Sequence, residues 1–492
     1  MLPPELLRHI FSFIEDVECF DTVRCQPVPR RYLVETERGR RNIQTKSALL
    51  LVSWQFYEIA IELAWSWISI YSSTRLLWMD GVITKRIPSK SLMHLDRHRN
   101  TTQSYTDTIE NYVYHLPGCW IRRLDIVISA PNDLAYSHQS RIVAHILRAC
   151  TNLRVFVSDI SVKSVDCQRT ASFVLDALKS LRHLTRLDWA GHEGPSFEDY
   201  IHLLPHLTKL EQWTTGRMAS PHLSDKEVIQ LLQQDGEEDS EQSEEKEARA
   251  IVLRNLKVIQ VSDRPVYSCL RLISHLDLPS LTHLAFRHLD FQPRTNSLFS
   301  ALGHQITHIY THDIRTSVGP FGYAHVLVIC PNLQHLTFSP RLRDERHQQS
   351  WRHARLRSLG LRAVLPLTMP KEDQLANNIA SSLETFLRHV SGARIASDLP
   401  CLTTIRIEDS DDAALEYETR FGGAWNELCC AAGIRLEDTK GRRIPSELPP
   451  ISTVAPQDVH EGTDRVNPRR KRPPILKRIF GHVVGGMRRK RK

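Results

Sequence analysis

The chain of 492 residues is longer than one ordinary domain, and its hydrophobic content of 41% is enough for a sizeable core. No apolar run approaches the roughly 20 residues of a transmembrane helix, so we expect no integral membrane segment. The net charge of +8 is local, because residues 465–492 hold 12 Lys or Arg and no acid, whereas residues 1–464 hold 52 Lys or Arg against 56 acids. A body with this balance does not indicate a nucleic-acid-binding protein. The ten cysteines show no Cys-x-x-Cys pair and no secretory signal accompanies them, which argues against a disulfide framework and favours a cytoplasmic and/or nuclear protein.

The first fourteen residues, MLPPELLRHIFSFI, predict a short amphipathic helix. Their apolar side chains recur at steps of three and four residues, and Pro3 and Pro4 suit a first helical turn, where backbone donors lack partners. The polar segment of residues 19–47 lacks helical periodicity, so we expect a long loop there. Residues 48–70, ALLLVSWQFYEIAIELAWSWISI, then predict a helix that is apolar on nearly all sides and is therefore internal or shared with a partner.

Between residues 105 and 440 the chain repeats a phrase of the form Leu-x-x-Leu-x-Leu at intervals of 23 to 49 residues. The fourth and sixth residues of such a phrase point inward from a short strand, and the first turns the chain into it. Segments with helical apolar spacing precede many of the strands, and several end at a proline, which cannot continue a helix. One unit cannot cover its own apolar face, so we predict a solenoid of stacked parallel strands. The ten phrases begin at Ile121, Leu153, Leu184, Leu207, Leu256, Leu281, Ile306, Leu333, Leu356 and Leu402.

The third and fifth residues of each phrase are predicted to point to the concave face of the solenoid, where a target would bind. His283, His308 and His335 hold the third position of three consecutive phrases and should stack in a file on strands about 4.8 Å apart. The file could recognise an acidic or phosphorylated partner, respond to pH or hold a metal, or it could be solvated polar residues without a role. We expect no metal, because no carboxylate or cysteine lies at a ligand-like spacing. The predicted target-binding residues are Arg123, Asp125, Arg186, Asp188, His283, His308, Tyr310, His335 and Arg406, and Lys209 and Glu211 are expected on the same face.

Two charged segments are predicted to lie outside any packed core. The acidic insertion of residues 235–247, DGEEDSEQSEEKE, contains no apolar residue and should be a disordered loop within the solenoid. Residues 441–492 predict a disordered basic tail. Its two basic clusters could bind a nuclear import receptor, a nucleic acid or an acidic lipid, or could have no specific partner.

The sequence shows no phosphate-binding loop, no nucleophile elbow, no dinucleotide-binding glycine pattern and no His-Glu-x-x-His zinc motif. We therefore expect that the protein is not an enzyme, and that it has no catalytic residue and no cofactor.

Three stretches within residues 1–75 resemble an F-box, the helical module that docks on the Skp-type linker of cullin ubiquitin ligases. They are LPPELL followed by IF within residues 2–11, LVS followed by an aromatic residue within 51–56, and the Ala, Leu and WSWI of residues 60–68. Together with the phrases, they make the chain resemble a fungal-type F-box protein with C-terminal leucine-rich repeats. The resemblance implies an α/β fold, with a short helical F-box module before an irregular leucine-rich-repeat solenoid of parallel concave strands and convex helices. The linker-docking residues that it implies are Leu2, Pro3, Leu6, Ile10, Val52 and Phe56.

The function that this resemblance implies is that of a substrate-recognition adaptor. Its F-box would bind the linker of a Skp–cullin–F-box ubiquitin ligase, and its solenoid would bind the target protein that the ligase modifies. The alternative is a leucine-rich-repeat scaffold that recruits no ligase, with the N-terminal helical hairpin as a cap on the solenoid.

Overall fold

The computed structural model describes residues 62–83, 117–162, 168–189, 193–216, 251–261, 266–290, 293–315, 322–338, 351–362, 373–407 and 424–437, and residue 443. These residues all belong to the first of two compact units, Met1–Ser446. The F-box-like stretches before residue 62, the acidic insertion and, apart from residue 443, the basic tail lie outside the described residues.

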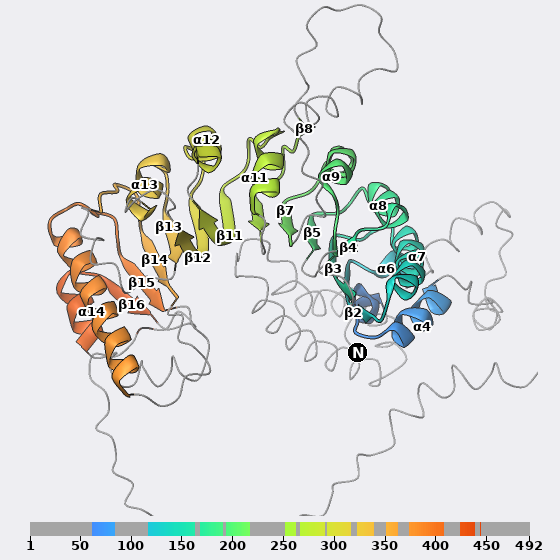
Figure 1. Ribbon diagram of the computed structural model, residues 1–492, viewed down its shortest axis with the longest axis horizontal. Helices are drawn as coiled ribbons and strands as arrows, with labels where there is room; N and C mark the ends of the chain where they lie inside the picture. Colours follow the sequence, from blue (N-terminus) through green and yellow to red (C-terminus); the bar gives the residue numbers. More distant parts are fainter. Residues whose placement is uncertain are drawn as a thin grey trace, which may run out of the picture. The chain divides into compact units, whose positions relative to one another are not determined.

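A single sheet of twelve strands organises the described part of the chain, and the order of its strands follows the sequence (Figure 1). All eleven neighbouring pairs are parallel. The predicted α/β class and the parallel stacking of the phrases are therefore confirmed. The strands are β1 (Trp67–Ile70), β2 (Arg123–Ala130), β3 (Val155–Val162), β5 (Arg186–Trp189), β7 (Gln212–Thr215), β9 (Val258–Val261), β11 (His283–Asp290), β12 (His308–Arg315), β13 (His335–Phe338), β14 (Ser358–Leu361), β15 (Thr404–Ile407) and β16 (Arg435–Glu437).

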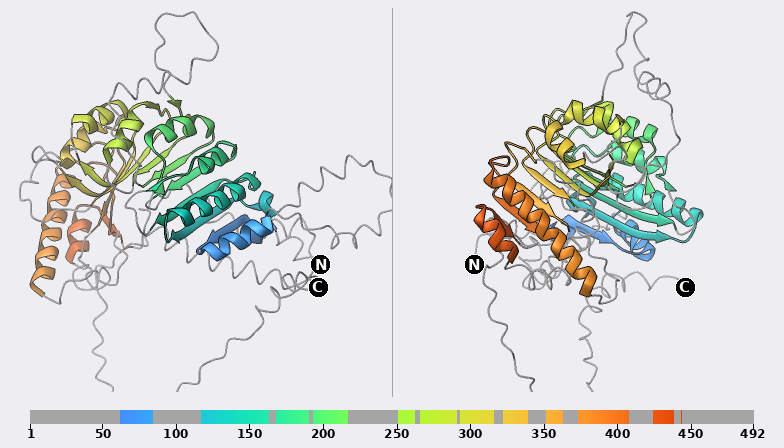
Figure 2. Two further views of the ribbon diagram at one scale, coloured as in Figure 1. Left: turned by 45° about the vertical axis from the view of Figure 1, so that its right-hand side comes forward. Right: turned by 60° about the vertical axis from the view of Figure 1, so that its left-hand side comes forward.

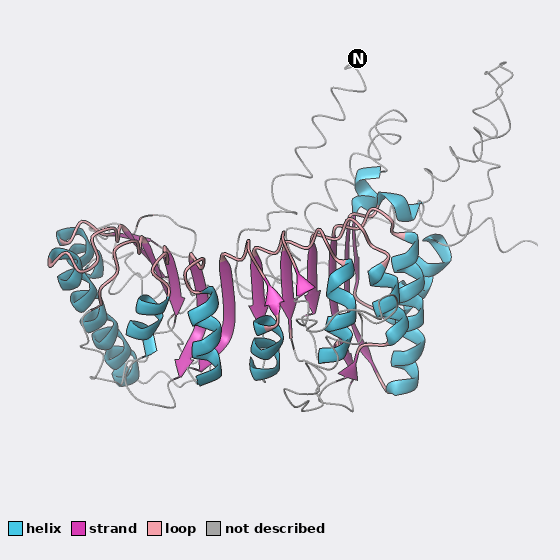
Figure 3. Ribbon diagram, turned by 90° about the horizontal axis from the view of Figure 1, so that it is seen from above, coloured by secondary structure: helices cyan, strands magenta, loops and turns pink. Residues whose placement is uncertain are grey.

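Helices cover one face of this sheet, and the strands form the other face (Figures 1 and 2). Seen from above, the helices stand in a row along one side of the strands (Figure 3). A parallel pair needs a connection that returns the chain to the start of the next strand, and the helices supply it. The helices are α4 (Ser73–Ile83), α6 (Pro117–Trp120), α7 (Asp133–Ala149), α8 (Ser172–Lys179), α9 (Phe197–Leu203), the 3-10 turn η3 (Leu204–His206), α11 (Val266–Ser274), α12 (Pro293–Leu302), α13 (Gly322–Ile329), α14 (Asp373–Ile395) and a helix over 424–431. Two short parallel pairs lie outside the main sheet, β4 (Gln168–Arg169) with β6 (Glu193–Gly194) and β8 (Ile251–Val252) with β10 (Leu276–Asp277).

Each strand is aligned with its neighbour by contacts that recur from repeat to repeat. Two successive N–H groups at the start of a strand donate to one carbonyl of the preceding repeat, as Thr282 and His283 do to Lys257 O at 3.0 and 2.9 Å. An asparagine just before the phrase adds a side-chain bond, as Asn255 Nδ2 does to Thr208 O at 2.8 Å. Because these bonds join equivalent positions in successive repeats, they hold the register across the sheet.

The core lies between the sheet and the helices. The fourth residue of the phrases is fully buried there, as Leu124, Leu284 and Leu336 show with exposed fractions of 0%. Aromatic residues fill wider gaps, and Trp189 and Trp213 both pack edge-on against Tyr200, with ring centroids 5.7 and 4.9 Å apart. Each buried leucine contributes about 1.5–3 kcal/mol, so the stack is held by many modest terms.

The fourth repeat differs from its prediction. The phrase expected at residues 207–210 lies before the strand, and Trp213 occupies the inward fourth position of β7, paired with fourth-position residues on both sides. A tryptophan takes the inward position that leucine holds in other repeats. A pattern that searches for leucine therefore predicted this position three residues before Trp213, where it actually lies. Lys209 and Glu211 consequently lie before the strand, and the expectation that they stand on the concave strand face is wrong.

The sheet extends by one strand beyond the ten phrases at each end, with β1 and β16. The helix predicted over 48–70 does not continue to its end, because residues 62–66 are helical and Trp67–Ile70 form β1, which pairs with β2. The sequence WISI has the aromatic and β-branched residues that suit a strand. The solenoid sheet therefore begins inside residues 1–75, which the resemblance assigns to the F-box module.

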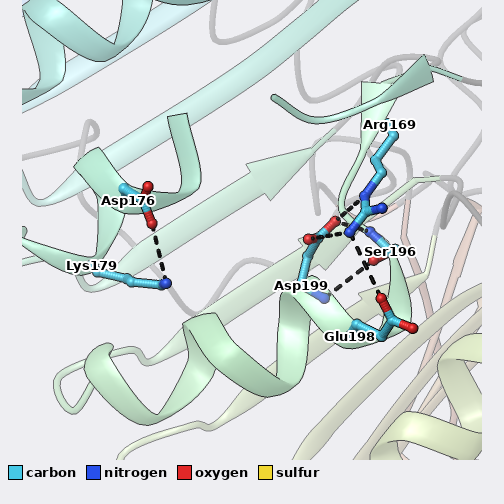
Figure 4. Close-up of polar contacts among 6 residues, drawn as sticks. All are labelled: Arg169, Asp176, Lys179, Ser196, Glu198 and Asp199. Atoms are coloured by element: carbon cyan, nitrogen blue, oxygen red, sulfur yellow. Dashed lines mark hydrogen bonds and ion pairs between the residues drawn. The ribbon is translucent and has the colours of Figure 1, made fainter. Parts of the chain in front are cut away.

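A polar cluster outside the main sheet joins the short pair β4 and β6 to α9 (Figure 4). Arg169 Nε and Nη2 donate to the Asp199 carboxylate at 3.0 and 2.9 Å. Asp199 also accepts from Ser196 N at 2.7 Å, and its own N–H donates to Ser196 Oγ at 3.2 Å, which completes a capping box at the start of the helix. Burial alone would raise the pKa of Asp199, but the bonds from Arg169 and Ser196 outweigh it and hold the pKa below its usual value. The cluster therefore stabilises the connections that follow β3 and β5.

Candidate functional site

The candidate site is the face of the sheet opposite the helices, which we name the strand face. It consists of the third and fifth positions of the repeats, because alternate strand residues point to opposite faces and the fourth positions fill the core. The first row, in register order, is Trp67, Arg123, Val155, Arg186, Gln212, Val258, His283, His308, His335, Ser358, Thr404 and Arg435. The second row is Ser69, Asp125, Val157, Asp188, Thr214, Gln260, Ala285, Tyr310, Thr337, Gly360, Arg406 and Glu437.

The first strands of the strand face carry a buried ionic network around Asp125. Its carboxylate accepts hydrogen bonds from Trp67 Nε1 at 2.7 Å, from Arg123 Nε at 2.9 Å and from Ser69 Oγ at 3.3 Å. The Arg123 guanidinium also lies over the Trp67 ring, with its central carbon 4.3 Å from the ring centroid. The network therefore joins the edge strand β1 to β2 by side chains as well as by the backbone ladder.

A second pair of the same kind lies on β5. Arg186 Nε donates to Asp188 Oδ2 at 2.7 Å, and both side chains are buried. The other oxygen, Asp188 Oδ1, and the hydroxyl of Thr214 on the next strand are buried atoms for which the described residues provide no hydrogen bond. This part of the strand face is internal rather than a solvated surface.

The strand register places Arg123, Asp125, Arg186 and Asp188 on the strand face, where they are buried. Their exposed fractions are 1%, 5%, 4% and 1%. Residues two apart on a strand point the same way, so each Arg-x-Asp sequence brings opposite charges into contact, and an Arg–carboxylate pair of this kind tolerates burial. A role for these residues in target binding stays a prediction.

The histidine file forms as the register predicts. The His283 and His308 rings stack with centroids 3.9 Å apart and planes 12° apart, and His308 and His335 stack at 4.2 Å and 17°. Tyr310 lies beside the file, with its ring centroid 6.4 Å from that of His308. His283 is 8% exposed, whereas His308, Tyr310 and His335 are partly exposed. The interpretation of the three histidines as merely solvated side chains therefore does not fit their packing.

A threonine before each of the first two histidines contacts Nδ1 of the ring. Thr307 Oγ1 lies 2.8 Å from His308 Nδ1 and 3.2 Å from Thr282 O. Thr282 Oγ1 makes the same two contacts, with His283 Nδ1 at 2.8 Å and with Lys257 O at 3.4 Å. Each hydroxyl has one proton, which either Nδ1 or the carbonyl can accept, so these contacts orient the Nδ1 edge of both rings in either tautomer. His283 Nε2 is buried, and the described residues offer it no partner.

The file is neutral at physiological pH. Burial and the like charge of His335 lower the pKa of His283 to about 4. Burial and both flanking rings lower that of His308 to about 3. Burial, helped by the Arg357 and Arg406 guanidinium groups, also lowers the pKa of His335. Near pH 7 the file therefore carries no positive charge.

A metal ion does not fit the file. A metal lies in the plane of each imidazole that binds it, whereas stacked parallel rings direct their Nε2 lone pairs side by side instead of toward one point. In agreement, no group of three or more His, Cys, Asp or Glu side chains in the described part of the chain could hold a metal ion.

The last strands present an exposed ionic cluster. The Glu437 carboxylate accepts from Arg406 Nε and Nη2 at 3.1 and 2.7 Å, and Arg435 Nε lies 2.8 Å from its other oxygen. Glu437 is buried, whereas 45% of the Arg406 side chain and 59% of the Arg435 side chain are exposed. Among the predicted target-binding residues, His308, Tyr310, His335 and Arg406 thus combine a place on the strand face with exposure to solvent.

The predicted linker-docking residues Leu2, Pro3, Leu6, Ile10, Val52 and Phe56 lie outside the described residues. Arg435 and Glu437 were not anticipated, because no leucine phrase marks β16. The dipeptide Thr-His at 282–283 and 307–308 is the sequence pattern that could have indicated the threonine–imidazole contacts of the file.

Comparison with known proteins assigns no family. No family model and no curated protein matches the chain. A solved structure described as the crystal structure of a TLR13–ssRNA13 complex is similar over 58% of this chain, with 16% sequence identity and a TM-score of 0.30, and the match covers 32% of that chain. The fold assignment rests on the sheet itself, whose parallel strands and one-sided helices are compatible with a leucine-rich-repeat solenoid. Within the described residues, no helix is both long and apolar enough to cross a membrane.

Proposed function

We propose that the protein is an adaptor that binds a partner protein through the strand face. The observation that supports this most directly is the continuous register of twelve strands, which sets third- and fifth-position side chains in two long rows. Solenoids of this kind use such extended faces for binding. The exposed members, from Tyr310 to Arg435, combine an aromatic ring, imidazoles and guanidinium groups, which is a composition suited to a protein surface.

We further propose that the adaptor serves a Skp–cullin–F-box ubiquitin ligase and that the bound partner is its target. This part rests on the F-box resemblance of residues 1–75. The other subunits of the ligase would transfer ubiquitin, and this chain, not itself an enzyme, would contribute proximity by holding a target lysine near the charged conjugating enzyme. The adaptor would act in the cytoplasm and/or the nucleus, and the basic tail would serve nuclear import.

One observation favours the alternative, a repeat scaffold that recruits no ligase. The strand β1 belongs to the sheet and comes from the range that resembles the F-box. An N-terminal segment that continues directly into the first strand could cover the end of the solenoid, as the terminal units of repeat arrays do.

A binding experiment with the full chain separates the two functions. The immobilised chain should retain a purified Skp-type linker, and the double variant Leu2→Ala, Pro3→Ala should lose most of that retention. Leu77→Ala, which alters an exposed leucine of α4, is the matched control and should retain the linker. Circular dichroism of all three proteins should be unchanged. Failure of the unaltered chain to retain the linker would favour the scaffold.

A further inference from the structure

We propose that the strand face over β12 to β16 binds an acidic segment of a partner protein, and that binding adds a proton to the histidine file. The segment would present carboxylates from Asp or Glu side chains. Such a partner would be the target of the proposed adaptor, on whose claim of protein binding this inference rests. Two features of the site carry it, a cationic end of the strand face and an imidazole file beside that end.

The exposed end of the strand face carries an excess of positive charge. Arg406 and Arg435 share the single buried carboxylate of Glu437, which fixes the two guanidinium groups on the last strands. Each guanidinium has five N–H donors. Within the described residues, two of those of Arg406 bond to Glu437 and Arg435 Nε lies 2.8 Å from it, so most of the donors remain for a partner. Arg357, at the turn into β14, adds a third exposed guanidinium. Among the described residues, three cations against one carboxylate favour an anionic segment and repel a basic one.

The histidine file explains why an anion would bring a proton with it. The neutral His308 ring, whose Nδ1 lies 2.8 Å from Thr307 Oγ1, carries one proton, so only one of its nitrogens can donate. A carboxylate only accepts hydrogen bonds, whereas a protonated imidazole donates from both nitrogens and carries a positive charge. The anion therefore favours the charged ring, and the charged ring favours the anion.

The file accepts at most about one proton, and His335 is the favoured site. In the described part of the chain, the charged groups beside His335 are Arg357 and Arg406, and both oppose its protonation in the free protein. A bound carboxylate would offset these two charges. Near His283 at the other end of the file, Lys257 is already paired with Glu211 at 3.0 Å, and the ring is buried. Stacking at 3.9 and 4.2 Å makes a second charge in the file costly.

A basic, donor-rich segment is the competing occupant. It would suit the accepting nitrogen of a neutral ring, and the buried Nε2 of His283, to which the described residues offer no partner, is open to that interpretation. Such a segment would have to approach Arg406 and Arg435, which repel it. It would also bind less tightly as the pH falls, whereas the acidic segment would bind more tightly, so pH distinguishes the two.

The test uses fluorescence anisotropy of the full chain with two labelled probes, a decapeptide of glutamate and a decapeptide of lysine, at pH 7.5 and pH 5.5. The glutamate probe should bind, and its affinity should increase toward pH 5.5 by up to about tenfold per pH unit if one proton is taken up. Arg406→Gln should weaken it at least about fivefold, which corresponds to the loss of one charge-assisted contact. Arg388→Gln is the matched control, because Arg388 also pairs with a glutamate, Glu384, but on the helix α14, and it should leave affinity unchanged.

His335→Gln isolates the proton. It should bind the glutamate probe at pH 7.5 within about twofold of the unaltered chain and lose most of the gain at pH 5.5. Preference for the lysine probe, equal affinity of the Arg406→Gln chain, or an undiminished pH effect in His335→Gln would each overturn the proposal. If Arg406→Gln fails to fold, Arg435→Gln replaces it. Retention of the Skp-type linker does not involve these residues. Failure to bind the linker would refute the ligase function and leave the acidic-segment proposal intact. Failure to bind the glutamate probe would refute the acidic-segment proposal and leave the ligase function intact.

Discussion

Lowering the pH from 7 to 5 is expected to destabilise the fold through the histidine file. The folded chain keeps His308 neutral, because burial and the neighbouring rings lower its pKa to about 3, whereas an unfolded histidine titrates near 6.5. The unfolded state therefore binds a proton that the folded state does not. A group whose pKa is lowered on folding supports stability above its unfolded pKa and loses that support as the pH falls toward its folded pKa.

The magnitude follows from these two values. At pH 7 the unfolded ring is mostly neutral, and the cost of keeping the folded ring neutral is small. At pH 5 the unfolded ring is almost fully protonated and the folded one is not, so His308 alone lowers the free energy of unfolding by about 2 kcal/mol between the two pH values. His283, with a pKa of about 4, should add a similar amount.

Urea unfolding followed by tryptophan fluorescence at pH 7 and pH 5 measures the effect. His308→Gln removes the titrating group. Between pH 7 and pH 5, the free energy of unfolding of this variant should therefore fall by about 2 kcal/mol less than that of the unaltered chain. The comparison uses the change with pH, not the absolute stability, because the variant also loses ring stacking. His206→Gln, at an exposed histidine of η3, is the control and should behave like the unaltered chain. Equal acid sensitivity of His308→Gln and the unaltered chain would refute the neutral, buried description of the file.

Three further substitutions test other parts of the structure, each by urea unfolding. Asp125→Ala should cost about 3–5 kcal/mol, because it removes the carboxylate that three donors on β1 and β2 share, and an unchanged midpoint would contradict that network. Asp199→Asn should destabilise the chain more at pH 7 than at pH 3, because the lowered pKa of Asp199 beside Arg169 gives stability that is fully present above about pH 4 and is lost as the pH falls through the pKa of the folded state; a constant difference would contradict the ion pair. Leu336→Ala should cost about 2–5 kcal/mol as a fully buried core position, whereas Val328→Ala, at 76% exposure, should cost little.

The repeated architecture was predictable because it depends on a local pattern. In each phrase the first leucine turns the chain into the strand, and the fourth and sixth residues point inward and cause the repeats to stack. Nine of the ten predicted phrases align with a strand as expected. The exception shows the limit of a leucine pattern, since Trp213 fills the same inward position with a larger side chain. The edge strands β1 and β16 were missed for a related reason. Trp67–Ile70 and Arg435–Glu437 each pair with a single neighbour, and their sequences contain too few leucines to match the phrase.

The strand face shows which properties of a site are local and which are not. Alternate residues of a strand point to opposite faces of the sheet, so the file of His283, His308 and His335 could be predicted from the spacing of the phrases in the sequence. The charge of the file could not, because it depends on burial and on stacking between residues 25 or more positions apart. The Arg-x-Asp sequence of β2 and of β5 is a local pattern that indicates an internal ion pair, and it distinguishes these buried pairs from Arg406, whose carboxylate partner lies on the next strand. Arg123 and Arg186 are buried beside the carboxylates of their own strands, whereas Arg406 and Arg435 share Glu437 at the end of the sheet and are 45% and 59% exposed. This exposure, together with the excess of guanidinium groups over carboxylates among the described residues, is why the candidate binding surface lies at β12 to β16.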